Sequence, residues 1–295
     1  PLERASECGR ARVRSESHTT DPGTHRRRSH QQSDLVGWRR IGSSRAFQAW
    51  RARSKAACGS ASNRQAVTGQ SDVDSFPRSP RDVRATYEEI GAHFAKTRAH
   101  PWREVSDFLD AIDPQDGTVG LDVGCGNGRH TDRLARVVDR SVGLDASRTL
   151  LETARTRAAE DGWNAGFCQG DAARLPIATD AVDVAVYVAT IHHLPDRETR
   201  VASLDELARV LSPGGTGLVS AWATTHDRFD VDVDDAEWGF DTTVDWTMPD
   251  GETVPRFYHI YAPAEFETDV ARSRLAVDDA WVASGNCYAR VSAEQ

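Results

Sequence analysis

The chain has 295 residues, with 36 Lys and Arg against 45 Asp and Glu, which gives a formal net charge of −9. This length suits one large domain or two ordinary ones. No apolar run approaches the roughly 18 residues that a membrane-spanning helix requires, and no hydrophobic segment follows the N-terminus, so the sequence predicts neither membrane insertion nor secretion. The five cysteines contain no C-x-x-C pair and leave one thiol over if paired, which favours a reducing, cytoplasmic setting.

Charge divides the chain into two unlike parts. Residues 1–70 carry fourteen Lys and Arg against five Asp and Glu, a formal charge of +9, and the remaining residues have a formal charge of −18. The basic part has hardly any apolar periodicity, so it cannot bury enough surface to offset its ordering entropy. We therefore expect residues 1–80 to be a basic, disordered extension and residues 81–295 to form the folded domain.

The origin of the basic extension has two interpretations. The chain begins with Pro1 and its single methionine is Met248. We therefore expect residues 1–70 to be upstream sequence that was included through a misannotated start. The less favoured alternative is a basic tail that binds RNA through its phosphates.

Arginine replaces lysine almost throughout, since Lys55 and Lys96 are the only lysines. Together with the excess of acids, this predicts a halophilic, high-salt cytoplasm, in which exposed carboxylates keep a protein hydrated and long-range repulsion is screened. The negative charge does not exclude a nucleic-acid substrate, because phosphate attraction contributes little at such salt concentrations.

Two amphipathic helices are predicted before a sheet. Apolar residues recur at helical spacing from Val83 to Phe94, and a second apolar face runs from Trp102 to Leu109. Strands and helices then alternate, with strands ending near residues 123, 144, 168, 188 and 222 and helices over 129–138, 148–161 and 197–211. This order predicts an α/β, Rossmann-like, doubly wound and mostly parallel seven-stranded sheet, closed by an antiparallel pair over 275–282 and 286–291. Ligands of such a sheet bind at the carboxyl ends of its strands.

Residues 223–256 are acidic and are predicted to be irregular, although Trp238, Phe240 and Trp246 lie among them. A loop of this length inside a compact domain is usually functional or disordered. We expect an insert that acts as a lid on the substrate side, followed by a helix over 263–272.

The most informative motif joins the first strand to the helix that follows it, in the order L-D-V-G-C-G-N-G-R over residues 121–129. Gly124, Gly126 and Gly128 let the backbone adopt positive φ and lie flat against a ligand. A turn of the form G-x-G-x-x-G leaves room for a pyrophosphate, whereas this tighter spacing suits a cofactor without phosphates. Asp145 ends the second strand, where a carboxylate can accept hydrogen bonds from both ribose hydroxyls, and Asp171 follows the third strand.

The order of these motifs, with G-L-D, G-D-A and a P-G-G turn after the glycines, resembles the class I S-adenosylmethionine-dependent methyltransferases. The resemblance implies the class I methyltransferase fold and S-adenosyl-L-methionine as the cofactor. A nicotinamide-binding Rossmann domain is the rival, and the glycine spacing disfavours it. The resemblance implies these cofactor-binding residues: Asp122, Gly124, Cys125, Gly126, Asn127, Gly128, Asp145, Ala146, Asp171, Ala172 and Ala189.

A narrower resemblance covers residues 83–291. Thr97-Arg98, Ile191-His-His193, Trp222-Ala223 and Arg256-Phe-Tyr-His259 look like motifs of the tRNA wobble-uridine carboxymethyl methyltransferases. Members of that family esterify the carboxylate of 5-carboxymethyluridine, and many work with a small zinc-binding activator subunit, so the resemblance implies a tRNA substrate and such a partner. The sequence shows no metal site of its own. It departs from the family near residues 284–290, where a tryptophan-rich stretch is missing, and in the acidic insert.

Methyl transfer from a sulfonium is an in-line displacement, so the protein chiefly aligns the nucleophile and excludes water. A carboxylate needs no general base at neutral pH, and the useful groups are cations and donors that hold it. Each candidate also has a structural interpretation as a helix cap, an ion pair or ordinary packing. We expect the catalytic residues to be Arg98, His192, His193, Arg256 and His259.

Two alternatives stay open. A methyltransferase acting on a quinone-like or carboxylic acid metabolite shares the cofactor motifs, and an apolar acceptor pocket would favour it. A catalytically silent adenosyl-binding partner is disfavoured by the intact Gly126, Asp145 and Asp171, although these residues indicate binding rather than turnover. The tRNA interpretation requires an open, cationic path beside the sulfonium.

Overall fold

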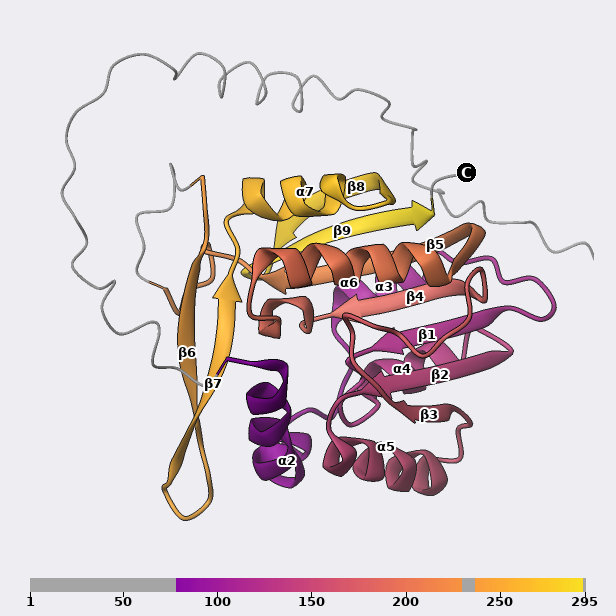
Figure 1. Ribbon diagram of the computed structural model, residues 1–295. Helices are drawn as coiled ribbons and strands as arrows, with labels where there is room; N and C mark the ends of the chain where they lie inside the picture. The colour runs from indigo at the N-terminus through magenta and orange to yellow at the C-terminus, as the bar shows by residue number, and fades with distance from the viewer. Residues whose placement is uncertain (1–77, 230–236, 294–295) are drawn as a thin grey trace, which may run out of the picture. The chain divides into compact units, whose positions relative to one another are not determined.

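The computed structural model describes residues 78–229 and 237–293, so the basic segment over residues 1–77 and its expected disorder lie outside the described part. The strands of the main sheet are β1 (Val119–Val123), β2 (Arg140–Asp145), β3 (Gly166–Gln169), β4 (Val182–Val188), β5 (Leu211–Trp222), β8 (Leu275–Ala283) and β9 (Asn286–Ala293). Their order is β3-β2-β1-β4-β5-β9-β8, with β1 to β5 parallel and β9 and β8 antiparallel (Figure 1). This confirms the predicted doubly wound sheet and its closing antiparallel pair.

Helices cover both faces of this sheet, and β4 explains why. Ala185 and Tyr187 pack with α6 (Arg197–Val210) and α7 (Pro263–Arg272). Val184, Val186 and Val188 pack with α3 (Arg103–Asp110) and α4 (Arg129–Ala135) on the other face. Successive strand residues point to opposite faces, so a strand that is covered on both sides needs a continuous apolar run. In the described ranges, no helix has the length and apolar character needed to cross a bilayer. The helical elements are α2 (Pro80–Lys96), α3 (Arg103–Asp110), α4 (Arg129–Ala135), α5 (Arg148–Asp161), η2 (Ile191–His193), α6 (Arg197–Val210) and α7 (Pro263–Arg272).

The acidic insert contains regular structure, so the prediction of an irregular segment over 223–256 was wrong. β6 (Phe240–Thr247) and β7 (Thr253–Ile260) form an antiparallel hairpin. Large apolar side chains alternate along β6 at Phe240, Val244 and Trp246, but the acids between them conceal this period in the sequence. Val244 packs against Tyr258 and Ile260 in a small core of the hairpin.

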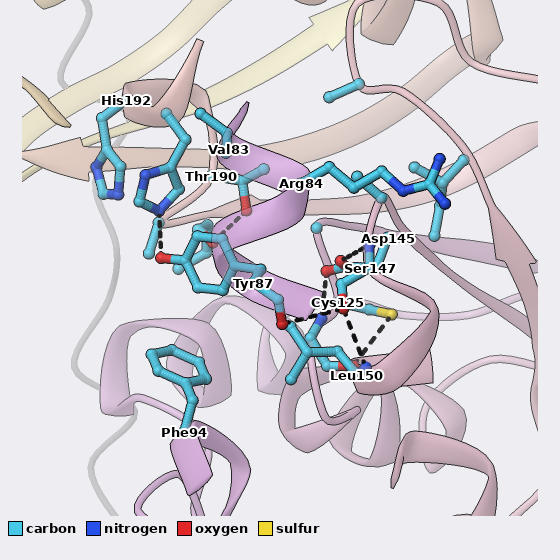
Figure 2. A pocket seen from close by; sticks show the side chains of 18 of the residues that line it. Val83, Arg84, Tyr87, Phe94, Cys125, Asp145, Ser147, Leu150, Thr190 and His192 are labelled. Carbon is cyan, nitrogen blue, oxygen red and sulfur yellow. Dashed lines mark hydrogen bonds between the residues drawn. The ribbon is translucent and has the colours of Figure 1, made fainter. Parts of the chain in front are cut away.

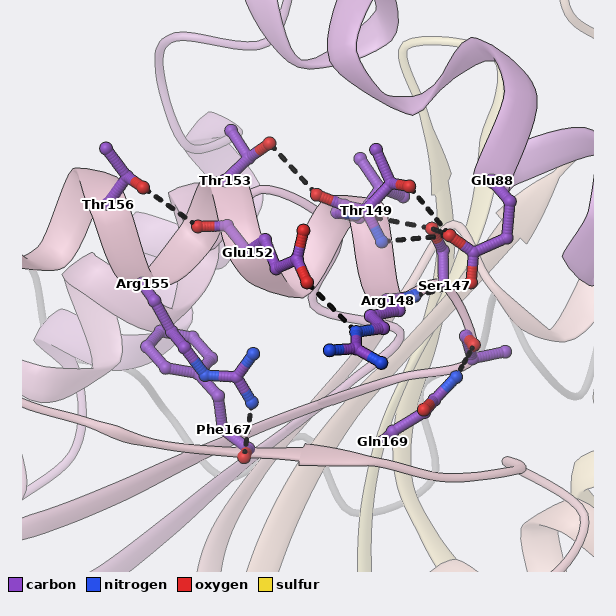
Figure 3. A network of polar contacts seen from close by, with 12 residues as sticks. Glu88, Ser147, Arg148, Thr149, Glu152, Thr153, Arg155, Thr156, Phe167 and Gln169 are labelled. Atoms are coloured by element: carbon purple, nitrogen blue, oxygen red, sulfur yellow. Dashed lines mark hydrogen bonds and ion pairs between the residues drawn. The ribbon is translucent and has the colours of Figure 1, made fainter.

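Glu88 ties helix α2 to the start of α5. Its carboxylate accepts hydrogen bonds from the backbone N–H groups of Arg148 and Thr149, at 2.7 and 2.9 Å, and from Thr149 Oγ1 at 2.7 Å (Figure 3). The first N–H groups of a helix have no partner within the helix, so Glu88 acts as a cap that another helix supplies. This contact fixes α2 beside the carboxyl ends of the parallel strands.

Replacing Glu88 with Gln is expected to lower the free energy of unfolding by about 2 kcal/mol at pH 7, because a charged cap with several donors is lost. Burial would raise the pKa of Glu88, but the hydrogen bonds from Thr149 and Arg148 outweigh it and lower the pKa from 4.5 to about 2. The folded-state pKa is depressed, so this stability is present above pH 4.5 and is lost as the pH falls towards 2.

Urea unfolding of the two proteins at pH 7, 5 and 3 checks this expectation. The difference between wild type and Glu88→Gln should shrink as the pH falls. Glu152→Gln is the matched control, because Glu152 is an exposed α5 carboxylate whose one ion pair among the described residues is with Arg148 in the same helix. A pH-independent difference for Glu88→Gln would contradict the capping role.

Candidate functional site

A cavity of about 630 Å³ lies between helix α2 and the carboxyl ends of the parallel strands. Asp145 from β2, Thr190 and His192 from the loop after β4, and Tyr87 from α2 are among the residues of its wall. Figure 2 shows the Tyr87 side chain reaching from α2 towards the loop after β4. The position agrees with the rule that open α/β sheets bind ligands outside the carboxyl ends of their strands.

Two of the predicted cofactor-binding residues, Asp122 and Gly128, do not line the cavity. Asp122 is 1% exposed and accepts a hydrogen bond from Thr131 Oγ1 at 2.6 Å. A Cβ on Gly128 would lie 3.0 Å from Trp163, so this glycine allows close packing inside the fold. The other predicted cofactor-binding residues line the cavity: Gly124, Cys125, Gly126, Asn127, Asp145, Ala146, Asp171, Ala172 and Ala189.

Asp145 joins the end of β2 to the glycine turn. Its carboxylate accepts hydrogen bonds from the backbone N–H groups of Gly126 and Ser147, each at 2.8 Å. Burial raises the pKa of Asp145 to about 6, although these two hydrogen bonds oppose the rise. Gly126 has a φ of +53°, and no atom lies within 4 Å of the place that a Cβ would occupy. An acidic acceptor beside exposed backbone, with apolar Leu150 on the same wall, fits the hydroxyls and the ring of an adenosyl group.

Asn127 connects the glycine turn to the end of helix α2. Its buried Nδ2 donates hydrogen bonds to the backbone carbonyls of Ala95 and Arg98, at 3.0 and 2.8 Å. The sequence suggested a cofactor contact for this residue, but the structure shows that its side chain is used to hold the main chain of Arg98. The Arg98 guanidinium then lies 4.7 Å from the centre of the Phe94 ring, on the cavity wall.

The two histidines after β4 have opposite tautomers. His193 Nδ1 lies 2.9 Å from the carbonyl oxygen of Phe257, so Nδ1 carries the hydrogen and Nε2 accepts from the Tyr87 hydroxyl at 2.9 Å. His192 Nδ1 accepts from the Trp222 N–H at 3.0 Å, so its hydrogen is on Nε2. Burial lowers the pKa of His193 to about 3 and lowers the pKa of His192 well below its ordinary value. Neither ring is therefore a cation at neutral pH, and His192 is a neutral donor on the cavity wall.

Two arginines lie beside Trp246, at the end of the cavity that the hairpin covers. The Cζ atoms of Arg256 and Arg98 lie 5.2 and 5.7 Å from the centre of the Trp246 ring system. Arg256 is 5% exposed, and its Nη1 donates to Tyr258 Oη at 2.7 Å. Within the described residues, neither guanidinium forms an ion pair with a carboxylate. A buried and a half-buried cation without counter-ions among the described residues favour an anionic ligand at this end of the cavity.

His259 lies outside the cavity and is held in a separate cluster. Its Nδ1 lies 2.7 Å from Asp241 Oδ1, and its Nε2 lies 3.1 Å from Glu265 Oε1. Burial would lower the pKa of His259, but the hydrogen bonds to these two carboxylates outweigh it and raise the pKa. The expected contact with an acceptor is therefore replaced by a structural contact that joins β7 to β6 and α7.

Two aromatic residues that were not among the predicted site residues line the end of the cavity that the hairpin covers. Trp222 and Tyr258 stack with ring centres 4.8 Å apart and planes at 25°, and both line the cavity. Trp222 also stacks with His226, with ring centres 4.8 Å apart and planes at 28°, so Trp222 belongs to a stack of aromatic rings at this wall. Trp222 and Tyr258 both belong to motifs that resemble the tRNA methyltransferase family. The sequence therefore contained a signal for them, but only the titratable residues of these motifs were predicted to act in the site.

Comparisons with known proteins identify the kind of domain that carries this site. A family described as a methyltransferase domain matches residues 121–215. The tRNA (carboxymethyluridine(34)-5-O)-methyltransferase ALKBH8 of Macaca fascicularis is 36% identical over 157 residues, which cover 50% of this chain and 22% of that protein. A putative methyltransferase of Encephalitozoon cuniculi is 32% identical over 184 residues, which cover 61% of this chain and 80% of that protein. The chain thus spans about a fifth of the first relative's length.

Solved structures share the fold. The CcbJ methyltransferase of Streptomyces caelestis matches with a TM-score of 0.55 at 17% identity, over 75% of this chain and 100% of that one. A chain from the complex between the Haloferax volcanii Trm112 methyltransferase activator and the putative methyltransferase matches with a TM-score of 0.51 at 18% identity, over 72% of this chain and 98% of that one. At these identities the likeness shows the fold alone.

Proposed function

Because this chain belongs to the class I S-adenosylmethionine-dependent methyltransferases, we propose that it esterifies the carboxylate of 5-carboxymethyluridine, or of a related modified wobble uridine, in tRNA. The observation that carries the proposal is the pair Arg98 and Arg256, which lie beside Trp246 with no acidic partner among the described residues. A carboxylate acceptor would supply the negative charge that balances these two cations. The tRNA methyltransferase named ALKBH8 supports the choice of acceptor.

The residues on the opposite part of the cavity fit the cofactor. Asp145 would accept hydrogen bonds from the ribose hydroxyls, and the backbone at Gly126 would lie against the adenosyl group. Leu150 and Ala172 would pack against the adenine ring. When bound, S-adenosyl-L-methionine supplies the electrophilic methyl group.

The chemistry asked of the protein is alignment rather than proton transfer. An ionised carboxylate attacks without a general base, and the neutral state of His192 and His193 agrees with this. Arg256 and Arg98 would hold the acceptor carboxylate, and His192 Nε2 would donate a hydrogen bond to it. Trp222 and Tyr258 line the cavity, where they would contact the uracil ring and exclude water from the reacting atoms.

The same proposal includes a macromolecular partner. β3 is an edge strand of the main sheet, and its end carries Gln169 and Gly170 to the cavity wall. An edge strand can pair with a strand of another chain. We propose that a small zinc-binding activator subunit binds to this edge strand. A chain from a complex that contains the Haloferax volcanii Trm112 methyltransferase activator shares the fold of this protein, which supports the proposal.

Residues 81–295 would form the methyltransferase domain, with the β6–β7 hairpin as a lid on the acceptor side and residues 1–80 as an extension. The excess of acids and the presence of two lysines in the whole chain support a high-salt cytoplasm as the place of action. These assignments rest on composition and on the position of the hairpin beside α2.

The proposal is tested by methyl transfer from labelled S-adenosyl-L-methionine into bulk tRNA from a strain that lacks this gene. The assay is run with and without the co-purified small partner, and the nucleosides are identified by mass. Label in an alkali-labile ester of a carboxymethylated uridine is the expected result. Cofactor binding without label in RNA would contradict the tRNA acceptor and would favour a small carboxylic acid instead.

A further inference from the structure

Tyr87 connects three elements at the acceptor end of the cavity, which is the end that the β6–β7 hairpin covers. Its hydroxyl oxygen lies 2.9 Å from His193 Nε2, and His193 Nδ1 lies 2.9 Å from the backbone carbonyl oxygen of Phe257. Tyr87 belongs to α2, His193 to η2 and Phe257 to β7. Two hydrogen bonds in series therefore join α2 to the loop after β4 and to the hairpin.

Two side chains of the hairpin approach the same tyrosine. Arg256 Nη1 donates to Tyr258 Oη at 2.7 Å, and the centres of the Tyr258 and His193 rings lie 4.4 Å apart. Burial raises the pKa of Tyr87 well above its ordinary value, and Tyr258 raises it further, whereas Arg256 opposes the rise. A side-chain hydrogen bond with Tyr258 is among these causes, so the two tyrosine hydroxyls are neighbours.

The direction of these hydrogen bonds is fixed at both ends. A guanidinium only donates and a backbone carbonyl only accepts, whereas a hydroxyl or a neutral imidazole can do both. The Phe257 carbonyl needs the hydrogen on His193 Nδ1, so Nε2 accepts the hydrogen of Tyr87. The Tyr87 oxygen can then accept the hydrogen of Tyr258, whose oxygen already accepts from Arg256. Burial lowers the pKa of His193 to about 3, so the ring stays neutral, as this order requires.

This hydrogen-bond chain begins and ends on neighbouring residues of β7, and Tyr87 is its member from α2. Without the Tyr87 hydroxyl, the chain would contain no donor for His193 Nε2 and no acceptor for the Tyr258 hydrogen. A partly satisfied network is costly in a buried place, so Tyr258 would turn towards another partner. The Tyr258 contact is the shorter of two hydrogen bonds that orient Arg256, since its Nε lies 3.3 Å from the Val244 carbonyl oxygen.

We propose that Tyr87 is a positioning residue, whose hydroxyl sets the place of the Arg256 guanidinium through the Tyr258 hydroxyl. The inference rests on the proposed function, in which Arg256 binds the acceptor carboxylate, and it adds a residue that was not among the predicted site residues. Tyr87 acts through Arg256 rather than on the reacting atoms, because its own hydrogen is already donated to His193. Its ring packs against Phe94 with centres 5.5 Å apart, and this contact does not need the hydroxyl.

Tyr87→Phe tests the proposal, because it removes the hydroxyl and keeps the ring. Single-turnover methyl transfer to tRNA should slow by about 30-fold, while the affinity for S-adenosylhomocysteine should stay within about threefold. In an Arg256→Gln background the same change should slow transfer by less than about twofold, because no guanidinium is left to position. A loss of equal size in both backgrounds would overturn the proposal, since Tyr87 would then act independently of Arg256.

A second measurement needs neither RNA nor turnover. Hydrogen exchange of the Arg256 Nε–H is followed by NMR, and the signal is assigned from its absence in Arg256→Gln. This exchange reports how firmly the side chain is held. Tyr87→Phe should speed it by at least about tenfold, because the hydrogen-bond chain is broken. An unchanged exchange rate would overturn the proposal whatever the transfer assay shows.

Tyr187→Phe is the matched control. It also removes a tyrosine hydroxyl from a buried place, but this hydroxyl lies 2.9 Å from Ser203 Oγ, on the α6 side of the sheet. The control should change neither the exchange of Arg256 nor the transfer rate. A wild-type protein that leaves tRNA unlabelled, while the exchange responds to Tyr87→Phe as expected, would support the hydrogen-bond chain and would count against the proposed acceptor alone.

Discussion

Replacing Arg256 with Gln is expected to lower kcat for methyl transfer by about 100- to 1,000-fold, because the acceptor carboxylate loses the cation that aligns it. The affinity for S-adenosylhomocysteine should stay within about threefold, because the guanidinium contacts Trp246 and Tyr258 of the hairpin rather than the glycine turn. Single-turnover methyl transfer and calorimetric titration of the same preparations measure the two quantities separately.

Two further variants make this result specific. Arg256→Lys keeps the charge but loses the planar fork, so part of the rate should return. Arg290→Gln removes an exposed arginine of β9 and should leave the rate unchanged. Thermal unfolding of each variant is needed, because Tyr258 loses its hydrogen-bond donor when Arg256 is replaced. An unchanged kcat with weakened cofactor binding would move Arg256 to the cofactor side of the cavity.

The acceptor end is built from segments far apart in the chain, and this explains why it was harder to predict than the cofactor end. Trp246 of β6 donates through Nε1 to His93 Nδ1 of α2 at 3.2 Å, which joins the hairpin to the helix that lines the cavity. Arg256 reaches the same place from β7. A lid function for this hairpin follows from its position and stays a proposal.

The cofactor end could be read from the sequence because its signals are local. The glycine turn, the strand before it and Asp145 lie within 27 residues, and each has a backbone or side-chain reason to occupy its place. Even there, the functions of individual side chains were not readable. Asn127 stands inside the glycine motif, yet its amide binds carbonyls about 30 residues earlier in the chain.

His192 and His193 show more clearly why the role of a side chain could not be predicted from the sequence. Their charge and tautomers depend on the Trp222 N–H and the Phe257 carbonyl, which lie 30 and 64 residues further along the chain. No local pattern carries that information, because a tautomer is fixed by the partner that the fold supplies. His259 was misjudged for the same reason, since Asp241 and Glu265 surround it only after the hairpin and α7 have packed together.

Cofactor binding should weaken in acid, and Asp145→Asn should remove this dependence. Burial raises the pKa of Asp145 to about 6 in the ligand-free protein, and the ionised carboxylate is the form that accepts both ribose hydroxyls. The affinity for S-adenosylhomocysteine should therefore fall as the pH drops through 6, by up to about tenfold per unit. Asp145→Asn should bind about 100-fold more weakly at pH 7, because two ligand hydrogen bonds to a charged acceptor are lost. Its remaining affinity should be flat between pH 5 and 7.

Asp122 is the other carboxylate in this region that could produce a pH dependence, since burial raises its pKa to about 7. It bonds to Thr131 behind the turn and does not line the cavity, so Asp122→Asn should keep the fall in affinity near pH 6. Titrations of both variants at pH 5, 6 and 7 separate the two carboxylates. A pH dependence that survives Asp145→Asn and disappears in Asp122→Asn would mean that the turn itself, rather than a direct acceptor of the ribose, responds to the proton.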